Sequence, residues 1–148
     1  MMGDNKNIEG LYLLAARDLF KMKENPEYDH LKIGVSFYEI YCGKAFDLLN
    51  KRNQCAIRVD SKKRVNVVGL SEKIIGNRES LVYLIEHGLG ERVVGKTGMN
   101  ANSSRSHAIL QITLRNAKNG KKHGKMSFID LAGSERGADV KKSTKQTR

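Results

Sequence analysis

The sequence predicts a mixed α/β domain in which helices alternate with the strands of a central sheet. Three observations predict this class: apolar residues at helical spacing in two segments, one strand that is apolar on both faces, and a hairpin signal between two alternating segments. The chain has 148 residues, of which 39% are apolar, and this length suits one domain or part of a larger one.

The first expected element is an amphipathic helix over residues 10–23, which ends shortly before Pro26. Residues 32–41 are largely apolar on both faces, which predicts a central strand. Two short strands, residues 56–59 and 64–70, are expected on either side of a turn at residues 60–63. The apolar stripe of the helix consists of Leu11, Leu14, Ala15, Leu19 and Met22.

A second helix is expected from an N-cap at Asn77 to about residue 91. Residues 108–114 and 125–130 alternate in polarity, and the Asn119-Gly120 turn between them predicts an antiparallel hairpin. The segments 95–106 and 133–148 are polar and lack apolar periodicity. We expect the chain to be cut at both ends from a larger domain. The apolar positions of the second helix are Leu81, Leu84, Ile85 and Gly88.

The net charge of +11 predicts a polyanionic partner, either nucleic acid or an acidic protein surface, although each basic cluster also suits a solvated loop. No apolar stretch approaches the length needed to cross a membrane, so no membrane partner is expected. The N-terminus lacks the features of a signal peptide. The two cysteines fit no metal spacing and indicate a reduced intracellular setting.

Two short motifs carry the chemistry, at Asn100–His107 and at Asp130–Glu135. In the second, Asp130 and Gly133 form the D-x-x-G pattern, in which a carboxylate holds magnesium through water and a glycine amide approaches a terminal phosphate. In the first, the hydroxyls of Ser103 and Ser104 suit magnesium and the same phosphate. Taken singly, the aspartate also suits a turn cap and the serines an ordinary polar loop.

Together, in this order, the two motifs resemble switch I (about residues 98–107) and switch II (about residues 130–139) of a kinesin motor domain. The resemblance implies a P-loop NTPase-like α/β fold with a mixed central sheet flanked by helices, of which residues 1–148 are the central part, truncated at both ends. It implies ATP and Mg²⁺ as cofactors. By the same resemblance, the residues that serve nucleotide, phosphate and metal are Asn100, Ser103, Ser104, Asp130 and Gly133, while Arg105 and Glu135 form a salt bridge that closes the two switches.

The resemblance covers nearly the whole chain. Residues 36–41 and 47–49 are similar to the kinesin "F-x-E-I-Y" strand and its "D-L-L" continuation, and residues 137–139 are similar to kinesin-13, the internal-motor class that depolymerises microtubules. This implies tubulin as the partner and the cytoplasmic microtubule cytoskeleton, including a spindle or flagellum, as the location. The basic residues expected to contact the filament are Lys62, Lys63 and Arg64 in the hairpin and Lys141, Lys142 and Lys145 in the tail.

Residues 90–97 match the phosphate-loop pattern G-x-x-x-x-G-K-[ST]. A phosphate loop leaves a buried strand and opens a helix, whereas this stretch follows a predicted helix, so we expect it not to grip phosphate. We therefore expect this chain alone to have little or no ATPase activity. The alternatives are a transport kinesin of another class, a non-enzymatic nucleic-acid-binding module, and a self-sufficient nucleotidase that depends on Lys96.

Overall fold

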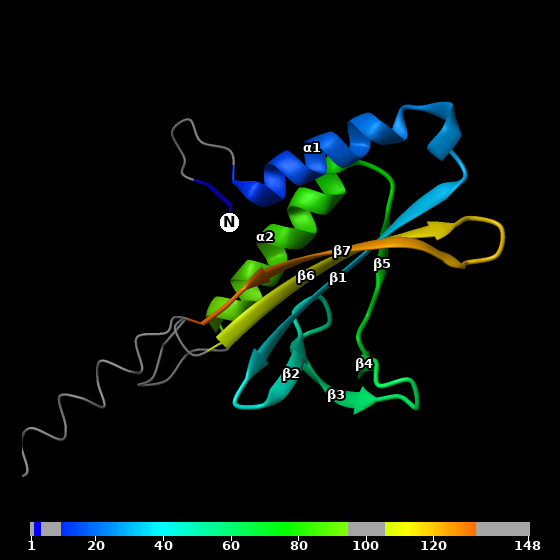
Figure 1. Cartoon of the computed structure of the whole chain (residues 1–148). Coiled ribbons are helices and arrows are strands. Elements are labelled where there is room, and N and C mark those ends of the chain that lie inside the picture. Colours follow the sequence, from blue (N-terminus) through cyan, green and yellow to red (C-terminus); the bar gives the residue numbers. More distant parts are fainter. Residues whose placement is uncertain (1, 4–9, 95–105, 133–148) are drawn as a thin grey trace, which may run out of the picture.

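The computed structural model describes residues 2–3, 10–94 and 106–132. They form an antiparallel sheet with two helices, α1 and α2, packed against one face (Figure 1). The helices are α1 (Leu11–Lys23), the short 3-10 helix η1 (Pro26–Tyr28) and α2 (Arg78–Val94). The strands are β1 (Leu31–Tyr41), β2 (Lys44–Asp47), β3 (Asn53–Val59), β4 (Val65–Val68), β5 (Lys73–Ile75), β6 (Ser106–Asn116) and β7 (Lys122–Asp130).

Helix α1 begins where predicted, but its buried face is rotated relative to the predicted stripe. Tyr12 and Ala16 are buried, whereas Leu11 and Met22 are exposed. The aromatic ring of Tyr12 accounts for the difference, because it packs edge-on against the rings of Phe37 and Phe128 in the sheet below. Burying this large ring outweighs burying the leucine beside it.

Strand β1 is central, as its two apolar faces predicted. It pairs along its whole length with β6, and its other edge pairs with β5 near one end and β2 near the other. The order across the described sheet is β4-β3-β2-β1-β6-β7. Because side chains alternate along a strand, Ile33, Val35 and Phe37 face the helices while Tyr38 packs in a second apolar cluster with Ala45 and Cys55.

Helix α2 starts at its predicted cap, where the side chain of Asn77 accepts a hydrogen bond from the amide of Ser80 at 2.8 Å. The helix lies very close to β1 at Gly88. A β-carbon built at Gly88 would lie 2.3 Å from Cδ1 of Phe37, so only glycine fits at this contact. The absence of a side chain lets the last turns of α2 lie against the sheet, and the helix continues to Val94, three residues beyond its predicted end.

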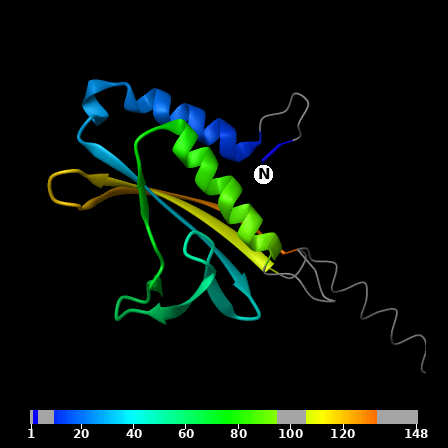
Figure 2. The same cartoon turned by 180° about the vertical axis from the view of Figure 1, so that it is seen from behind.

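The long hairpin formed by β6 and β7 turns at Gly120, whose φ of 67° requires the freedom of glycine. The smaller β3–β4 hairpin lies at the end of the molecule away from α1 (Figures 1 and 2). Two strands, β2 and β5, and the short helix η1 were not predicted. Asp47, at the end of β2, is buried and its carboxylate accepts hydrogen bonds from the amides of Leu49 and Ser71, which fixes the chain around these short strands.

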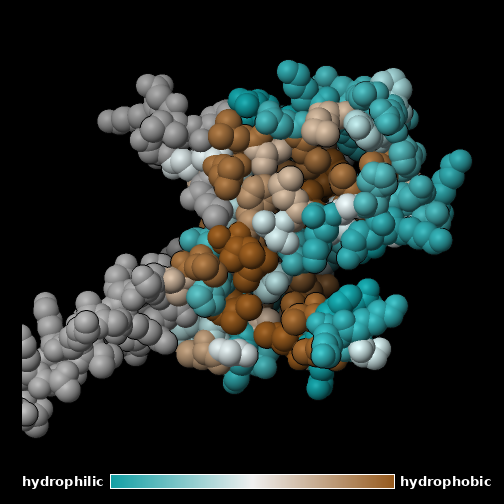
Figure 3. All heavy atoms as spheres, in the orientation of Figure 1, coloured by the Kyte–Doolittle hydropathy of each residue, from teal (hydrophilic) through white to brown (hydrophobic). Residues whose placement is uncertain are grey.

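Strand β7 is at the edge of the described sheet and carries three exposed apolar side chains, Met126, Ile129 and Leu131, the last lying just beyond the strand. Figure 3 shows apolar residues gathered across this face of the molecule. Apolar edges of this kind are suited to cover by another segment or molecule. In the described part of the chain, neither helix has the length and apolar character that a membrane span requires.

Candidate functional site

The C-terminal end of α2, the first residue of β6 and the last residue of β7 meet at one corner of the molecule (Figures 1 and 2). The register of the sheet brings them together. Ala108 of β6 is paired with Glu39 of β1 on one side and with Asp130 of β7 on the other. The three residues therefore form one row across the helix-facing side of the sheet, with the small alanine between two carboxylates.

Arg92, in the last turn of α2, links the parts of this corner. Its Nη1 donates to Oδ2 of Asp130 at 3.0 Å, and its Nη2 donates to the backbone oxygen of Ser106 at 3.0 Å. Its Nε lies 3.3 Å from the hydroxyl of Ser106 and 3.9 Å from Oε2 of Glu39. The arginine side chain is 9% exposed and that of Asp130 is 46% exposed, so the ion pair has one buried partner and one that faces solvent.

On the opposite face of the sheet, His107 fixes the chain that follows Asp130. Nδ1 of His107 accepts a hydrogen bond from the amide of Ala132 at 2.8 Å. An imidazole nitrogen accepts only when it carries no proton, so this bond requires the tautomer with the proton on Nε2. The end of the first sequence motif thus holds the start of the second by a direct hydrogen bond.

Tyr12 of α1 completes the electrostatic surroundings of the corner. Burial raises the pKa of its phenol above 10, the negative charge of Asp130 raises it further, and Arg92 lowers it. The phenol therefore remains neutral in this setting and adds no charge to the ion pair.

Only part of the predicted site lies within the described residues. Asp130 is at the end of β7 as predicted, and the register places it beside the start of β6, where the first motif ends. In the described part of the chain, no three His, Cys, Asp or Glu side chains form a metal-binding group. The remaining predicted nucleotide, metal and switch residues lie outside the described residues: Asn100, Ser103, Ser104, Arg105, Gly133 and Glu135.

The basic hairpin tip is described, and its three predicted residues differ in role. The carboxylate of Asp60 accepts hydrogen bonds from the amides of Lys62 and Arg64, and its Oδ2 accepts from Nε of Arg64 at 2.8 Å. These bonds, that from the Arg64 amide foremost, lower the pKa of Asp60 below its usual value. Arg64 therefore stabilises the turn while Lys62 and Lys63 are exposed on it. The tail residues Lys141, Lys142 and Lys145 lie outside the described residues.

The phosphate-loop match at residues 90–97 begins inside α2, which continues to Val94. A phosphate loop leaves a strand and opens a helix, and residues 90–94 instead form the end of one. The described part of this stretch therefore continues the predicted helix, and Lys96 and Thr97 lie outside the described residues.

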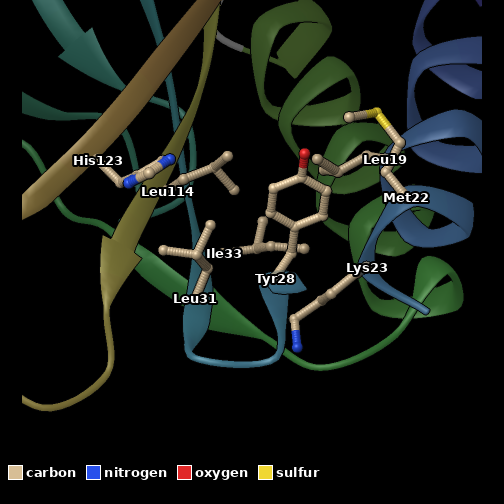
Figure 4. A pocket seen from close by; sticks show the side chains of 8 residues that line it. All are labelled: Leu19, Met22, Lys23, Tyr28, Leu31, Ile33, Leu114 and His123. Atoms are coloured by element: carbon tan, nitrogen blue, oxygen red, sulfur yellow. The ribbon is translucent and has the colours of Figure 1, made fainter. Parts of the chain in front are cut away.

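An apolar hollow of about 260 Å³ lies between α1, η1 and the strands β1, β6 and β7 (Figure 4). Leu19, Tyr28, Leu114 and His123 are among its lining residues. Leu114 and His123 are at the turn end of the β6–β7 hairpin, whereas Asp130 is at the opposite end. The hollow is therefore separate from the candidate site and holds none of its residues.

Sequence reasoning did not select Arg92, although a signal for it exists. Leu81, Ile85 and Gly88 are buried on one face of α2, and Arg92 follows at the same spacing, four residues further on. A charged residue on an apolar helical stripe needs a buried partner, and that requirement indicates an ion pair. Glu39, on a face of β1 that is otherwise apolar, gives the same signal.

Comparison with known proteins supports the family resemblance. The model of the kinesin motor domain matches residues 1–148. The chain is 48% identical to human kinesin-like protein KIF24 and 47% identical to the mouse protein of the same name, over 149 aligned residues in each case. Each alignment covers all of this chain and 11% of the relative. The chain belongs to the kinesin motor domain family.

Proposed function

We propose that this chain is the switch-bearing part of a microtubule-dependent ATPase motor, in which it senses the terminal phosphate of ATP and the accompanying Mg²⁺. The observation that carries the proposal is the position of Asp130. Its half-exposed carboxylate ends β7 beside the first residues of β6, so the described ends of the two motifs, Ser106–His107 and Asp130–Ala132, lie at one corner.

The described residues at this corner provide one carboxylate that could hold Mg²⁺, that of Asp130. Mg²⁺ prefers oxygen ligands, keeps several of its waters, and is usually bound through one or two carboxylates plus substrate phosphates. Asp130 provides one such carboxylate, and Arg92 occupies one of its oxygens in this structure. When bound, the ion would neutralise developing charge on the phosphates.

The proposed roles of the other residues follow the family resemblance. Ser103 and Ser104 serve Mg²⁺ and the γ-phosphate, Asn100 the nucleotide, and Gly133 offers its amide to the phosphate. Arg105 and Glu135 form the closing salt bridge that positions water. Support for this assignment comes from the His107–Ala132 hydrogen bond, which joins the chain just after Ser103–Arg105 to the chain just before Gly133–Glu135.

Equilibrium titration of a fluorescent, non-hydrolysable ATP analogue, with and without Mg²⁺, tests the nucleotide proposal. We expect Asp130→Asn to reduce the Mg²⁺-dependent gain in affinity by about tenfold or more, since a charged hydrogen-bonding group is lost from the metal. Lys96→Ala is expected to change affinity less than twofold, about 0.4 kcal/mol. A large loss with Lys96→Ala and none with Asp130→Asn would favour a self-sufficient nucleotidase built on residues 90–97.

The proposed filament contact is the β3–β4 hairpin, through Lys62 and Lys63. Both lysines lie on an exposed tip of fixed geometry, with Val59 and Val65 exposed on the strands beside it. Arg64 contributes mainly by holding Asp60. The tail lysines Lys141, Lys142 and Lys145 are proposed to add to this contact. Attraction between lysines and the acidic tubulin surface is long-range and is weakened by salt.

Microtubule co-sedimentation with charge reversal tests the contact. Lys62→Glu with Lys63→Glu is expected to reduce binding, while the matched reversal of Lys121 and Lys122, at the far end of the β6–β7 hairpin, is expected to leave it near the wild-type level. Equal losses in both pairs would indicate that net charge alone drives binding. Salt-sensitive binding to RNA or DNA that exceeds binding to microtubules would favour the nucleic-acid module instead.

The finer class we propose is kinesin-13, so that the parent protein would depolymerise microtubules at the cytoskeleton. This rests on residues 137–139 and on the similarity of residues 42–44 and 50–52 to that class. For the chain alone, we propose little or no ATP turnover, because residues 90–94 of the phosphate-loop match are helical. Microtubule-stimulated turnover by a purified sample free of contaminating ATPase would refute that part.

A further inference from the structure

Glu39 is a buried carboxylate placed between two arginines. It lies on the helix-facing side of β1, after Val35 and Phe37, and its side chain is 1% exposed. Its Oε1 accepts a hydrogen bond from Nη2 of Arg52, and Nε of Arg92 lies 3.9 Å from its Oε2. Burying a carboxylate is unfavourable unless charge and hydrogen bonds compensate it, so both arginines matter to it.

The two oxygens of Glu39 are not equally satisfied. Oε2 is buried and has no hydrogen-bond partner among the described residues. The nearest cation, Arg92, is within ion-pair range but beyond hydrogen-bond range of this oxygen. Oε2 of Glu39 is therefore an available second hydrogen-bond acceptor for the guanidinium of Arg92.

In this structure Arg92 is bonded to the other carboxylate, that of Asp130. Its Nη1 donates to Asp130 at 3.0 Å and its Nη2 donates to the backbone oxygen of Ser106, while its Nε donates to the hydroxyl of Ser106 at the longer distance of 3.3 Å. Because Glu39 and Asp130 flank Ala108 in one row of the sheet, the guanidinium lies between two carboxylates and reaches only one at hydrogen-bond distance. A shift of about 1 Å at Nε, from 3.9 Å to the usual length of a charged hydrogen bond, would complete the contact with Glu39.

We propose that Glu39 is a positioning residue that accepts Arg92 when the carboxylate of Asp130 is engaged elsewhere. The nature of that engagement, a hydrated Mg²⁺ ion, rests on the proposed function; the exchange of Arg92 between two carboxylates does not. Without a second carboxylate, releasing Asp130 would leave the charge of a buried arginine balanced only by the neutral oxygens of Ser106, and the arginine would compete with the metal ion for Asp130. With Glu39 in place, Asp130 is released while Arg92 keeps a paired charge.

Arg52 connects this exchange to the β2–β3 turn. Lys51 and Arg52 both have positive φ, 54° and 53°, which is uncommon for non-glycine residues and persists where surrounding contacts over-determine it. The contacts of Arg52 with Glu39 and with the ring of Phe46, 4.9 Å from its guanidinium carbon, supply that constraint. Arg52 thus fixes Oε1 and leaves Oε2 directed to Arg92.

The test measures solvent exchange of the Arg92 Nε–H proton by NMR in the whole 148-residue chain. In Asp130→Asn, which removes charge from a half-exposed side chain, we expect Nε–H to exchange more slowly than in wild type, by about threefold or more, because its 3.3 Å bond to the Ser106 hydroxyl is replaced by a stronger, charged bond to Glu39. An unchanged or faster rate would overturn the proposal. Arg115, whose Nε is bonded to Glu72 at 2.6 Å, is the internal reference and should not change.

Adding Glu39→Gln to Asp130→Asn should accelerate the exchange above the wild-type rate, since no carboxylate remains for Arg92. If the double variant does not fold, the single variant still decides the matter. A Mg²⁺ titration distinguishes this inference from the proposed function. Slower Nε–H exchange in Asp130→Asn, with no change in the wild-type exchange rate on adding Mg²⁺, would support the exchange of Arg92 between Glu39 and Asp130. It would contradict the metal role of Asp130. Mg²⁺ binding at Asp130 in wild type, with no slower Nε–H exchange in Asp130→Asn, would support the metal role and contradict the exchange of Arg92.

Discussion

The contact between Gly88 and Phe37 allows a prediction with a matched control in the same helix. Gly88 is buried against β1, and a β-carbon there would lie 2.3 Å from Cδ1 and 2.8 Å from Cε1 of Phe37. Gly90 is exposed two residues later, and a β-carbon there would meet nothing within 4 Å. Replacing each by alanine therefore separates helix propensity from packing.

The magnitudes follow from these two environments. Alanine is favoured over glycine inside a helix by about 1 kcal/mol, so Gly90→Ala should stabilise the chain by up to about that amount. Gly88→Ala has the same gain but must displace a ring that is fully buried and packed edge-on against Tyr12. Overpacking of this kind costs about 1–3 kcal/mol. The stabilities of the two variants should therefore differ by about 1–3 kcal/mol, which is the cost of overpacking alone.

Urea unfolding followed by circular dichroism measures this difference, with wild type and both variants compared at one pH. A third variant, Phe37→Ala, measures the energetic coupling between the two positions. In that background Gly88→Ala should lose most of its cost, because the Cγ, Cδ1 and Cε1 atoms that the new β-carbon would meet are gone. Equal stability of Gly88→Ala and Gly90→Ala would refute the close approach of α2 to β1. It would also argue against the position of Arg92 between Glu39 and Asp130, which depends on that approach.

Two further predictions concern buried ionisable groups. Burial raises the pKa of the Cys55 thiol, whereas Cys42 is exposed. Under native conditions an alkylating reagent should therefore modify Cys42 first and Cys55 only as the chain unfolds. Equal alkylation rates at the two cysteines would contradict the packing of β3. The raised pKa of Tyr12 means that the unfolded chain loses the phenolic proton first as pH rises above about 10, so stability should fall there. Tyr12→Phe should make that decline shallower in urea unfolding measured from about pH 9 to pH 11, and an unchanged slope would argue against burial of the phenol.

The sequence predicted the elements whose signals are local. Both helices and the β6–β7 hairpin follow from apolar periodicity, from the Asn77 cap and from the turn at Gly120. Strands β2 and β5 have four and three residues, too few to show a period, and they exist because β1 offers them an edge. Such strands are determined by pairing rather than by their own composition.

The candidate site divides in the same way. Asp130 was predictable because its motif is contiguous and ends a strand. Arg92 and Glu39 were not selected, because their meaning depends on the sheet register that places Glu39 and Asp130 on either side of Ala108. Only after three separate strands and a helix are assembled does a buried arginine between two carboxylates become visible.

The central claim is that the corner at the end of β7 holds a divalent ion together with nucleotide. Manganese(II) takes the same oxygen ligands as magnesium and broadens nearby NMR resonances, which detects even weak binding. On addition of Mn²⁺ and a non-hydrolysable ATP analogue, we expect selective broadening of the amide resonances of Asp130, Ala132, Ser106 and His107, lost in Asp130→Asn and retained in the control Glu72→Gln. Broadening centred elsewhere, or unchanged in Asp130→Asn, would contradict it.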